Sequence, residues 1–150
     1  MPTVDVIERV PAPLPRVYGI LREMERFPEF MENVESVTVL ERGDGYTVTR
    51  WVARLKGSRF EWTERDAFYP DQGRIEFEQV AGDLKVFRGF WQLTSHGEAE
   101  TEVVLSTTFE FGLPMVAALL NPLARIALRD NARAMLTAVA AEVRGSSQDG

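Results

Sequence analysis

Residues 113–143 read LPMVAALLNPLARIALRDNARAMLTAVAAEV, and the other elements are best understood as a partner for this segment. It is apolar and rich in alanine, a composition that predicts a long C-terminal helix. Pro114 suits the first turn of such a helix, and Gly145 follows its last apolar residue. Pro122 is the one internal helix breaker, so it predicts a kink or break near Asn121.

The predicted helix has two different sides. Arg125, Arg129 and Arg133 form one exposed stripe at helical spacing. The apolar residues placed on the far side are Leu120, Leu123, Ala127, Ala134 and Ala138. Asn131 is placed in the middle of this apolar side. A helix of this length spans roughly 45 Å and needs a large concave partner to bury so wide a face.

The residues before the helix supply that partner as a sheet. Alternation and turn signals predict strands at 3–10, 34–41, 46–55, 58–68, 74–80, 84–94 and 101–111, with short helices at 14–24 and around 27–31. The predicted fold is α+β: a curved antiparallel sheet of about seven strands wrapped around the C-terminal helix. We expect one domain over residues 1–144, followed by a disordered polar tail at 145–150.

One predicted hairpin carries most of the functional information. If Lys56 and Gly57 form a two-residue turn, the register follows from it. The inward pairs are then Ala53 with Phe60, Trp51 with Trp62, Thr49 with Glu64, and Thr47 with Asp66. The inner face of the hairpin therefore holds two carboxylates beside large aromatic rings.

These inward polar groups predict a cavity rather than a solid core. Burying Glu64, Asp66, Gln79 and Asn131 unpaired would cost several kcal/mol, whereas a water-lined or ligand-filled space removes that conflict. The candidate ligand-binding residues are Phe27, Phe30, Thr49, Trp51, Phe60, Trp62, Glu64, Phe77, Gln79, Phe87, Trp91, Leu123 and Asn131.

Each candidate also has a structural interpretation. A bend or slip of the strand would turn Glu64 and Asp66 to solvent, or a nearby arginine would pair with them. Trp62 and Trp91 fit plain core packing equally well, and Asn131 could bond a strand backbone.

Composition excludes several classes of function. A net charge of -6 and a pI near 4.9 argue against a general nucleic-acid binder. The absence of cysteine and the single histidine leave little for a disulfide framework, a metal site or a catalytic triad, and we expect no metal or cofactor. No signal segment or membrane-spanning apolar run is visible, so a cytoplasmic protein is expected, either monomer or homodimer.

Three motifs resemble the START-like, helix-grip (SRPBCC) superfamily, in its polyketide cyclase/aromatase and coenzyme-Q-binding branches. FPEF at 27–30 is similar to a W/Y-P-E-hydrophobic motif, and GDLKVFRGFW at 82–91 to a G-P-F-K-x-L-x-G-x-W run. RDNA at 129–132 resembles the last-helix segment that carries a pocket asparagine in the aromatase/cyclases. The resemblance covers residues 3 to 143 and implies the same fold around a hydrophobic ligand.

The sequence departs from the aromatase/cyclase pattern at three positions. Aligning FEW at 60–62 with the W-E-W motif of those enzymes puts Asp66 where an inward arginine belongs and Glu64 where a small hydroxyl residue belongs. Val34 stands where a pocket tyrosine is found. A carboxylate would repel an enolate rather than stabilise it, although Glu64 in an apolar pocket could serve as a base.

Three functions are therefore considered. The main hypothesis is a protein that binds a hydrophobic small molecule, such as a polyketide, a quinone or isoprenoid, or a lipid. The alternative is a polyketide cyclase/aromatase-like enzyme, with Glu64, Asp66 and Asn131 as catalytic candidates. The third is a protein-interaction module, as in ribosome-associated members of the superfamily.

Overall fold

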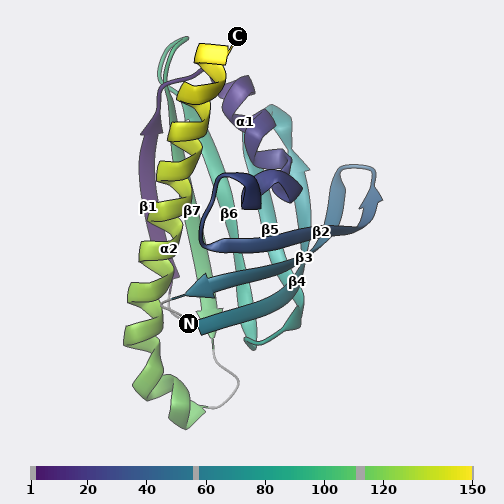
Figure 1. Ribbon diagram of the computed structural model, residues 1–150. Helices are drawn as coiled ribbons and strands as arrows, with labels where there is room; N and C mark the ends of the chain where they lie inside the picture. The colour runs from purple at the N-terminus through teal and green to yellow at the C-terminus, as the bar shows by residue number, and fades with distance from the viewer. Residues whose placement is uncertain (1–2, 56–57, 111–113, 150) are drawn as a thin grey trace.

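An antiparallel sheet curves around one side of a long helix (Figure 1). The computed structural model describes residues 3–55, 58–110 and 114–149, and the side chains of 55, 58, 114–124 and 146–149 lie outside that description. The elements are β1 (Thr3–Val10), α1 (Leu14–Arg22), the 3-10 helix η1 (Met24–Glu29), β2 (Val34–Gly43), β3 (Tyr46–Leu55), β4 (Ser58–Tyr69), the 3-10 helix η2 (Pro70–Gln72), β5 (Arg74–Gly82), β6 (Val86–Ser95), β7 (Thr101–Glu110) and α2 (Pro114–Asp149).

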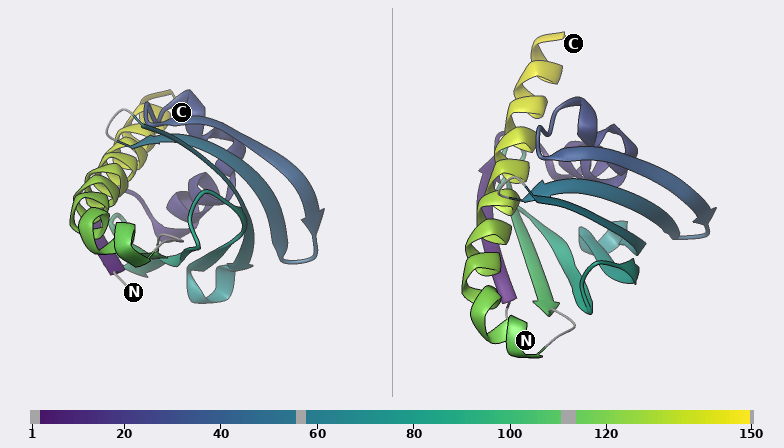
Figure 2. Two further views of the ribbon diagram at one scale, coloured as in Figure 1. Left: turned by 90° about the horizontal axis from the view of Figure 1, so that it is seen from below. Right: turned by 60° about the horizontal axis from the view of Figure 1, so that its bottom comes forward.

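The seven described strands follow the order β1-β7-β6-β5-β4-β3-β2 in a single sheet. Seen along its length, the sheet bends until its first and last strands approach the two sides of α2 (Figure 2). Register shifts between β2 and β3 and between β4 and β5 contribute to the bend, because an extra residue in one strand increases local twist. The predicted α+β fold, with a curved sheet around a C-terminal helix, is confirmed.

The predicted register of the β3–β4 hairpin is also confirmed. Trp51 lies opposite Trp62, and Thr49 lies opposite Glu64. The proposed turn at Lys56 and Gly57 lies outside the described residues, as does the last residue of the predicted strand 101–111. The register nevertheless places Glu64 and Asp66 of β4 on the concave face.

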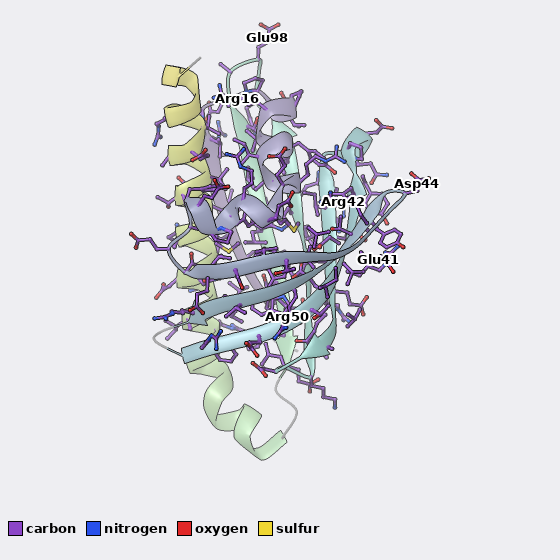
Figure 3. The ribbon with its side chains drawn as sticks, turned by 45° about the vertical axis from the view of Figure 1, so that its right-hand side comes forward. Arg16, Glu41, Arg42, Asp44, Arg50 and Glu98 are labelled. Atoms are coloured by element: carbon purple, nitrogen blue, oxygen red, sulfur yellow. The ribbon has the colours of Figure 1, made fainter. Side chains whose placement is uncertain are left out.

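The convex face of the sheet at this hairpin is charged. Arg50 and Glu41 project from the β2–β3 hairpin in Figure 3. Glu35 accepts a hydrogen bond from Arg59 Nε at 3.0 Å, which links β2 to β4 across that face.

None of the described helices is long and apolar enough to cross a membrane.

Helix α2 bears on two expectations. It is helical through Asn121, so the predicted kink or break is not a break, and the lower end of the helix in Figure 1 bends away from the main axis. It also continues past Gly145 to Asp149, where the sequence predicted a disordered tail. Extending an existing helix fixes one residue for each new hydrogen bond, so polar residues can continue it at small cost.

The buried face of α2 differs from the one predicted. Arg125, Arg129 and Arg133 are exposed, as expected, but so is Ala134, which was placed opposite them. Asn131 is half-buried, at the edge of the buried face. The residues against the sheet are Leu128, Ala132, Met135, Leu136, Val139, Ala140 and Val143. Large side chains gain more than alanines from burial, so they determine which way the helix faces.

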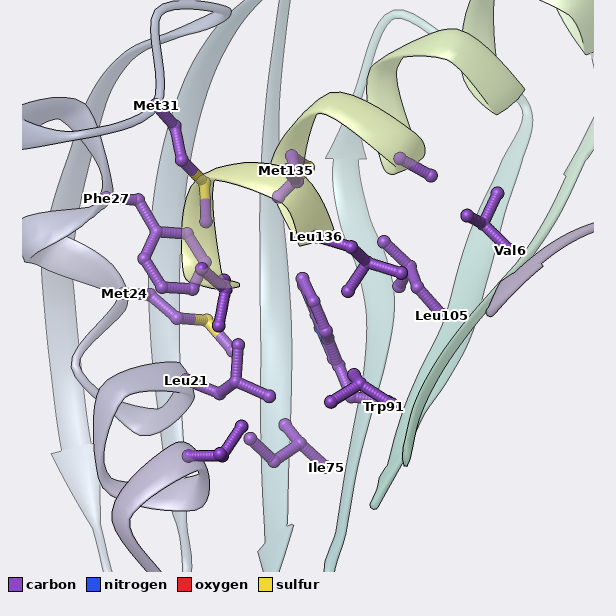
Figure 4. Close-up of a cluster of buried hydrophobic side chains, with 14 of the residues drawn as sticks. Val6, Leu21, Met24, Phe27, Met31, Ile75, Trp91, Leu105, Met135 and Leu136 are labelled. Carbon is purple, nitrogen blue, oxygen red and sulfur yellow. The ribbon is translucent and has the colours of Figure 1, made fainter. Parts of the chain in front are cut away.

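A dense core fills the end of the interior beneath α1 and η1. Leu21, Met24 and Phe27 point from these helices toward Trp91 of the sheet and Leu136 of α2 (Figure 4). These five side chains are buried, with Trp91 the most exposed at 3%. The short helices α1 and η1 therefore close one end of the interior. They do not cover the other half of the concave face.

A glycine in β6 permits close contact between strands, which gives a first prediction. A Cβ added to Gly89 would lie 1.9 Å from the Ser106 carbonyl oxygen of β7 and 2.8 Å from Phe77 Cζ. We expect Gly89→Ala to lower the free energy of unfolding by about 1–3 kcal/mol, because neither backbone nor ring can yield that far without strain. Chemical denaturation measures this change.

Gly19 in α1 is the matched control, because a Cβ there would meet nothing within 4 Å. Gly19→Ala should raise the free energy of unfolding by about 0.5–1 kcal/mol, since glycine inside a helix is less favourable than alanine. Equal effects of the two substitutions would contradict the strand packing described above.

Candidate functional site

A cavity lies between the concave face of the sheet and α2. Its volume, measured as the space open to the centres of water-sized groups, is about 50 Å³. It is lined by five aromatic rings, Trp51, Trp62, Phe77, Phe87 and Trp91, and by Val34, Ala53, Glu64, Leu105, Thr107, Leu128, Asn131, Ala132 and Met135. The space admits several water-sized groups, so a larger ligand requires side chains or α2 to move outward.

A second hollow continues from the first. Its volume by the same measure is about 30 Å³, and it shares Trp62, Phe87, Leu128 and Asn131 with the cavity. These four side chains form the partition between the two spaces, with the Trp62 and Phe87 rings 5.1 Å apart. Rotation of the partition side chains would join the two spaces into one longer cavity.

Most of the predicted ligand contacts fall on one of the two spaces. The cavity brings together Trp51, Trp62, Glu64, Phe77, Phe87, Trp91 and Asn131. Phe60 and Gln79 line the second hollow. The side chain of Leu123 lies outside the described residues.

Three candidates lie away from both spaces. Phe27 is fully buried, with its ring 5.7 Å from that of Trp51 and 6.2 Å from that of Trp91, so it supports the cavity wall from behind. Phe30 lines a separate surface hollow beside α1. The hydroxyl of Thr49 is occupied by two hydrogen bonds within the protein. The sequence could show that these side chains point inward but not which part of the interior they reach.

Several wall residues were not among the candidates. Leu105 and Thr107 share the inward face of β7, and their alternation could have identified them. Leu128, Ala132 and Met135 were missed because the buried face of α2 was placed too far around the helix.

A hydrogen-bonded network underlies the aromatic wall. Trp62 Nε1 donates to Glu64 Oε1 at 2.7 Å. Trp51 Nε1 donates to Thr49 Oγ1 at 2.8 Å, and Thr49 Oγ1 donates to Asp66 Oδ2 at 2.7 Å. The Trp51 and Trp62 rings stack at 5.6 Å with an angle of 11° between their planes. Each indole is thus held by a stacking contact on its ring face and by a hydrogen bond from its N–H.

The two carboxyls of the network are buried together. Glu64 is 3% exposed and Asp66 is fully buried, so the alternative in which the strand turns them to solvent is excluded. Burial raises the pKa of Glu64 well above its usual value, and the neighbouring Asp66 raises it further. Burial also raises the pKa of Asp66, while hydrogen bonds from Glu64, Thr49 and Thr47 oppose that rise.

A proton held by Glu64 explains an otherwise costly feature of the network. Asp66 Oδ1 is buried without a hydrogen-bond partner among the described residues. Two carboxylates this close cannot both ionise cheaply, so we expect Glu64 to retain a proton that it can donate to Asp66. The pair then carries one negative charge.

Asn131 faces the cavity but is already engaged. Its Oδ1 accepts a hydrogen bond from Asn33 Nδ2, in the connection between η1 and β2. Its Nδ2 points to Met135 Sδ at 3.5 Å, a weak acceptor. Its side chain therefore ties α2 to the β2 end of the sheet through another side chain, not through a strand backbone.

The buried acid gives a pH-dependent prediction. Because the folded protein keeps the Glu64 proton to higher pH than the unfolded chain, stability should fall as pH rises above about 4.3, the unfolded value. Glu64→Gln removes this contribution, so the variant should gain stability relative to the natural protein as pH increases. Thermal unfolding between pH 4 and pH 8 measures the difference.

Glu61→Gln is the control, because Glu61 lies on the same strand with its side chain 43% exposed and near Arg50 and Arg59. Its effect should stay within about 1 kcal/mol, as for other surface ion pairs. Parallel pH profiles for the natural protein and Glu64→Gln would show that Glu64 is not a buried, proton-holding group.

The sequence of the chain matches a known protein family, and the fold and cavity described above are consistent with that match. Residues 10–136 match the model of the family described as polyketide cyclase/dehydrase and lipid transport. The chain belongs to this family. The match confirms the START-like resemblance and the polyketide cyclase branch that the sequence motifs indicated.

Two relatives with different names are similar in sequence to this chain. The chain is 36% identical over 103 residues to the actinorhodin polyketide synthase bifunctional cyclase/dehydratase of Streptomyces coelicolor. That alignment covers 67% of this chain but only 32% of the relative, about a third of its length. It is also 25% identical over 114 residues to the ribosome association toxin RatA of Pseudomonas aeruginosa, covering 76% of this chain and 78% of that protein.

Solved structures share the whole fold. A protein of Thermus thermophilus superposes with a TM-score of 0.91 at 30% identity, covering 97% of this chain and 99% of that one. The Zhui aromatase/cyclase from Streptomyces sp. R1128 gives a TM-score of 0.84 at 22% identity, covering 95% and 93%. The second likeness concerns the fold alone.

Proposed function

We propose that the protein binds a hydrophobic small molecule in the cavity between the sheet and α2. The observation that carries this proposal is the set of five aromatic rings around a cavity of about 50 Å³, measured as the space open to the centres of water-sized groups. Ligand sites are typically concave, apolar and supplied with a few polar groups, and here Glu64 and Asn131 supply them. The family description, which joins polyketide cyclases with lipid transport, supports a ligand of this type.

A cyclase or dehydratase activity is the second candidate, and Glu64 is the observation that favours it. Burial raises the pKa of the Glu64 carboxyl, and a carboxyl with a raised pKa can act as a general acid or base. However, no arginine, lysine or histidine is among the described residues that line the cavity, so no cationic side chain there would stabilise an enolate oxygen. Binding therefore explains more of the site than turnover does.

Fluorescence titration with the neutral dye N-phenyl-1-naphthylamine tests the proposal. The three tryptophans of the protein, Trp51, Trp62 and Trp91, all line the cavity, so energy transfer from tryptophan should report binding there. Ala132→Phe fills the cavity from α2 and should weaken the dye by about tenfold or more, since it removes space rather than contacts.

Ala134→Phe is the matched control: the same substitution on the same helix, at an exposed position. It should leave the affinity unchanged. Thermal unfolding of both variants shows whether they remain folded. Equal affinities for the natural protein and folded Ala132→Phe would place the dye elsewhere and contradict the proposal.

A further inference from the structure

We propose that the cavity selects organic cations: a protonated amine or ammonium group on an apolar body, held between the tryptophan rings and Glu64. This inference rests on the proposed binding function and specifies the class of its ligand. It depends on the charge balance of the cavity wall and on the aromatic rings around it.

The described wall of the cavity holds an acidic side chain and no basic one. Glu64 is the one acidic residue among the described lining residues, and none of those residues is basic. Asp66 lies directly behind it on β4, fully buried. Two arginines of neighbouring elements are placed over other rings: Arg65 lies over the Tyr46 ring at 4.4 Å, and Arg22 over the Phe68 ring at 5.5 Å.

An isolated buried charge is unfavourable, and a bound cation would remove that cost. The proton shared by Glu64 and Asp66 cancels only one of their two possible charges. Their hydrogen bonds from Thr47, Thr49 and Trp62 come from neutral donors, which stabilise the remaining charge without neutralising it. A neutral ligand would leave this charge in place, whereas an ammonium group would pair with it.

The aromatic wall favours the same ligand. The Trp51 and Trp62 rings, stacked on each other, and the Phe87 ring, 5.1 Å from Trp62, surround the side of the cavity where Glu64 lies. Aromatic faces attract cations, most strongly for tryptophan and in sites shielded from water. Aromatic rings and a carboxyl together therefore offer a cation both of its usual partners.

Isothermal titration calorimetry with two matched ligands tests the inference. The probes are 2-(2-naphthyl)ethylammonium and 2-(2-naphthyl)ethanol, which share an apolar body and a hydrogen-bond donor but differ in charge. At pH 7.5 we expect the ammonium to bind about tenfold more tightly than the alcohol, from ion pairing and cation–π attraction. Glu64→Gln should reduce this ratio, and Glu64→Gln/Asp66→Asn should abolish it.

The outcomes separate the two proposals. If the alcohol binds as tightly as the ammonium to the natural protein, selection of cations is wrong and cavity binding stands. If neither probe binds, both proposals are contradicted. The affinity ratio of the two probes on the natural protein tests cation selection even where the double variant does not fold. A folded double variant that keeps the tenfold ratio would also overturn the inference.

Discussion

Phe27→Ala is expected to lower the free energy of unfolding by about 3–5 kcal/mol, the range found when a fully buried phenylalanine is removed from a core. The ring is fully buried and makes edge contacts with Phe30, Trp51 and Trp91 at centroid distances of 5.7 to 6.2 Å. No lining residue of the cavity would be removed, so the loss should appear in stability. Urea denaturation measures it.

Phe30→Ala is the control for this prediction, since it removes the same type of side chain three positions away. Phe30 is only half-buried, beside a surface hollow, and its removal should cost less than half as much. If Phe27→Ala left stability intact and abolished dye binding instead, Phe27 would be a ligand contact, as the sequence first indicated.

Thr49→Val is expected to cost about 2–4 kcal/mol, although it preserves the shape of the side chain. The hydroxyl of Thr49 accepts from Trp51 Nε1 at 2.8 Å and donates to Asp66 Oδ2 at 2.7 Å. Valine would leave a buried indole N–H without its acceptor and a buried carboxyl without one of its donors. The free energy of unfolding at pH 7 gives the size of the loss.

Thr47→Val separates this effect from the general cost of removing a hydroxyl. Thr47 makes one longer hydrogen bond to the same oxygen, at 3.1 Å, and its loss should cost only about 1 kcal/mol. Equal costs at the two positions would mean that Trp51 does not depend on Thr49, and that the network does not hold the aromatic wall in place.

The part of the site on the β3–β4 hairpin could be predicted from sequence, because the side-chain period of a strand is two and the turn sets the register. That reasoning placed Trp51, Trp62, Glu64 and Asp66 inside, and the structure agrees. It could not show that Trp62 donates to Glu64, since that bond depends on rotamers rather than on register.

The helical part of the site was less predictable. The apolar surface of α2 is wide, and a helical wheel shows its extent without showing which residues the sheet covers. Met135 and Leu128 contact the cavity, while Ala134, predicted to be opposite the arginines, faces solvent. The orientation depends on where the curved sheet meets the helix, and that is a property of the whole fold.

The indole N–H signals in a ¹H–¹⁵N correlation spectrum test the central claim most directly. The protein has three tryptophans, and all three line the cavity, so the spectrum contains three indole signals from one site. If a hydrophobic ligand binds between the sheet and α2, all three should shift together on addition of N-phenyl-1-naphthylamine and saturate at one equivalent. Dye binding that leaves the three indole signals in place would show that the ligand sits elsewhere and would contradict the account.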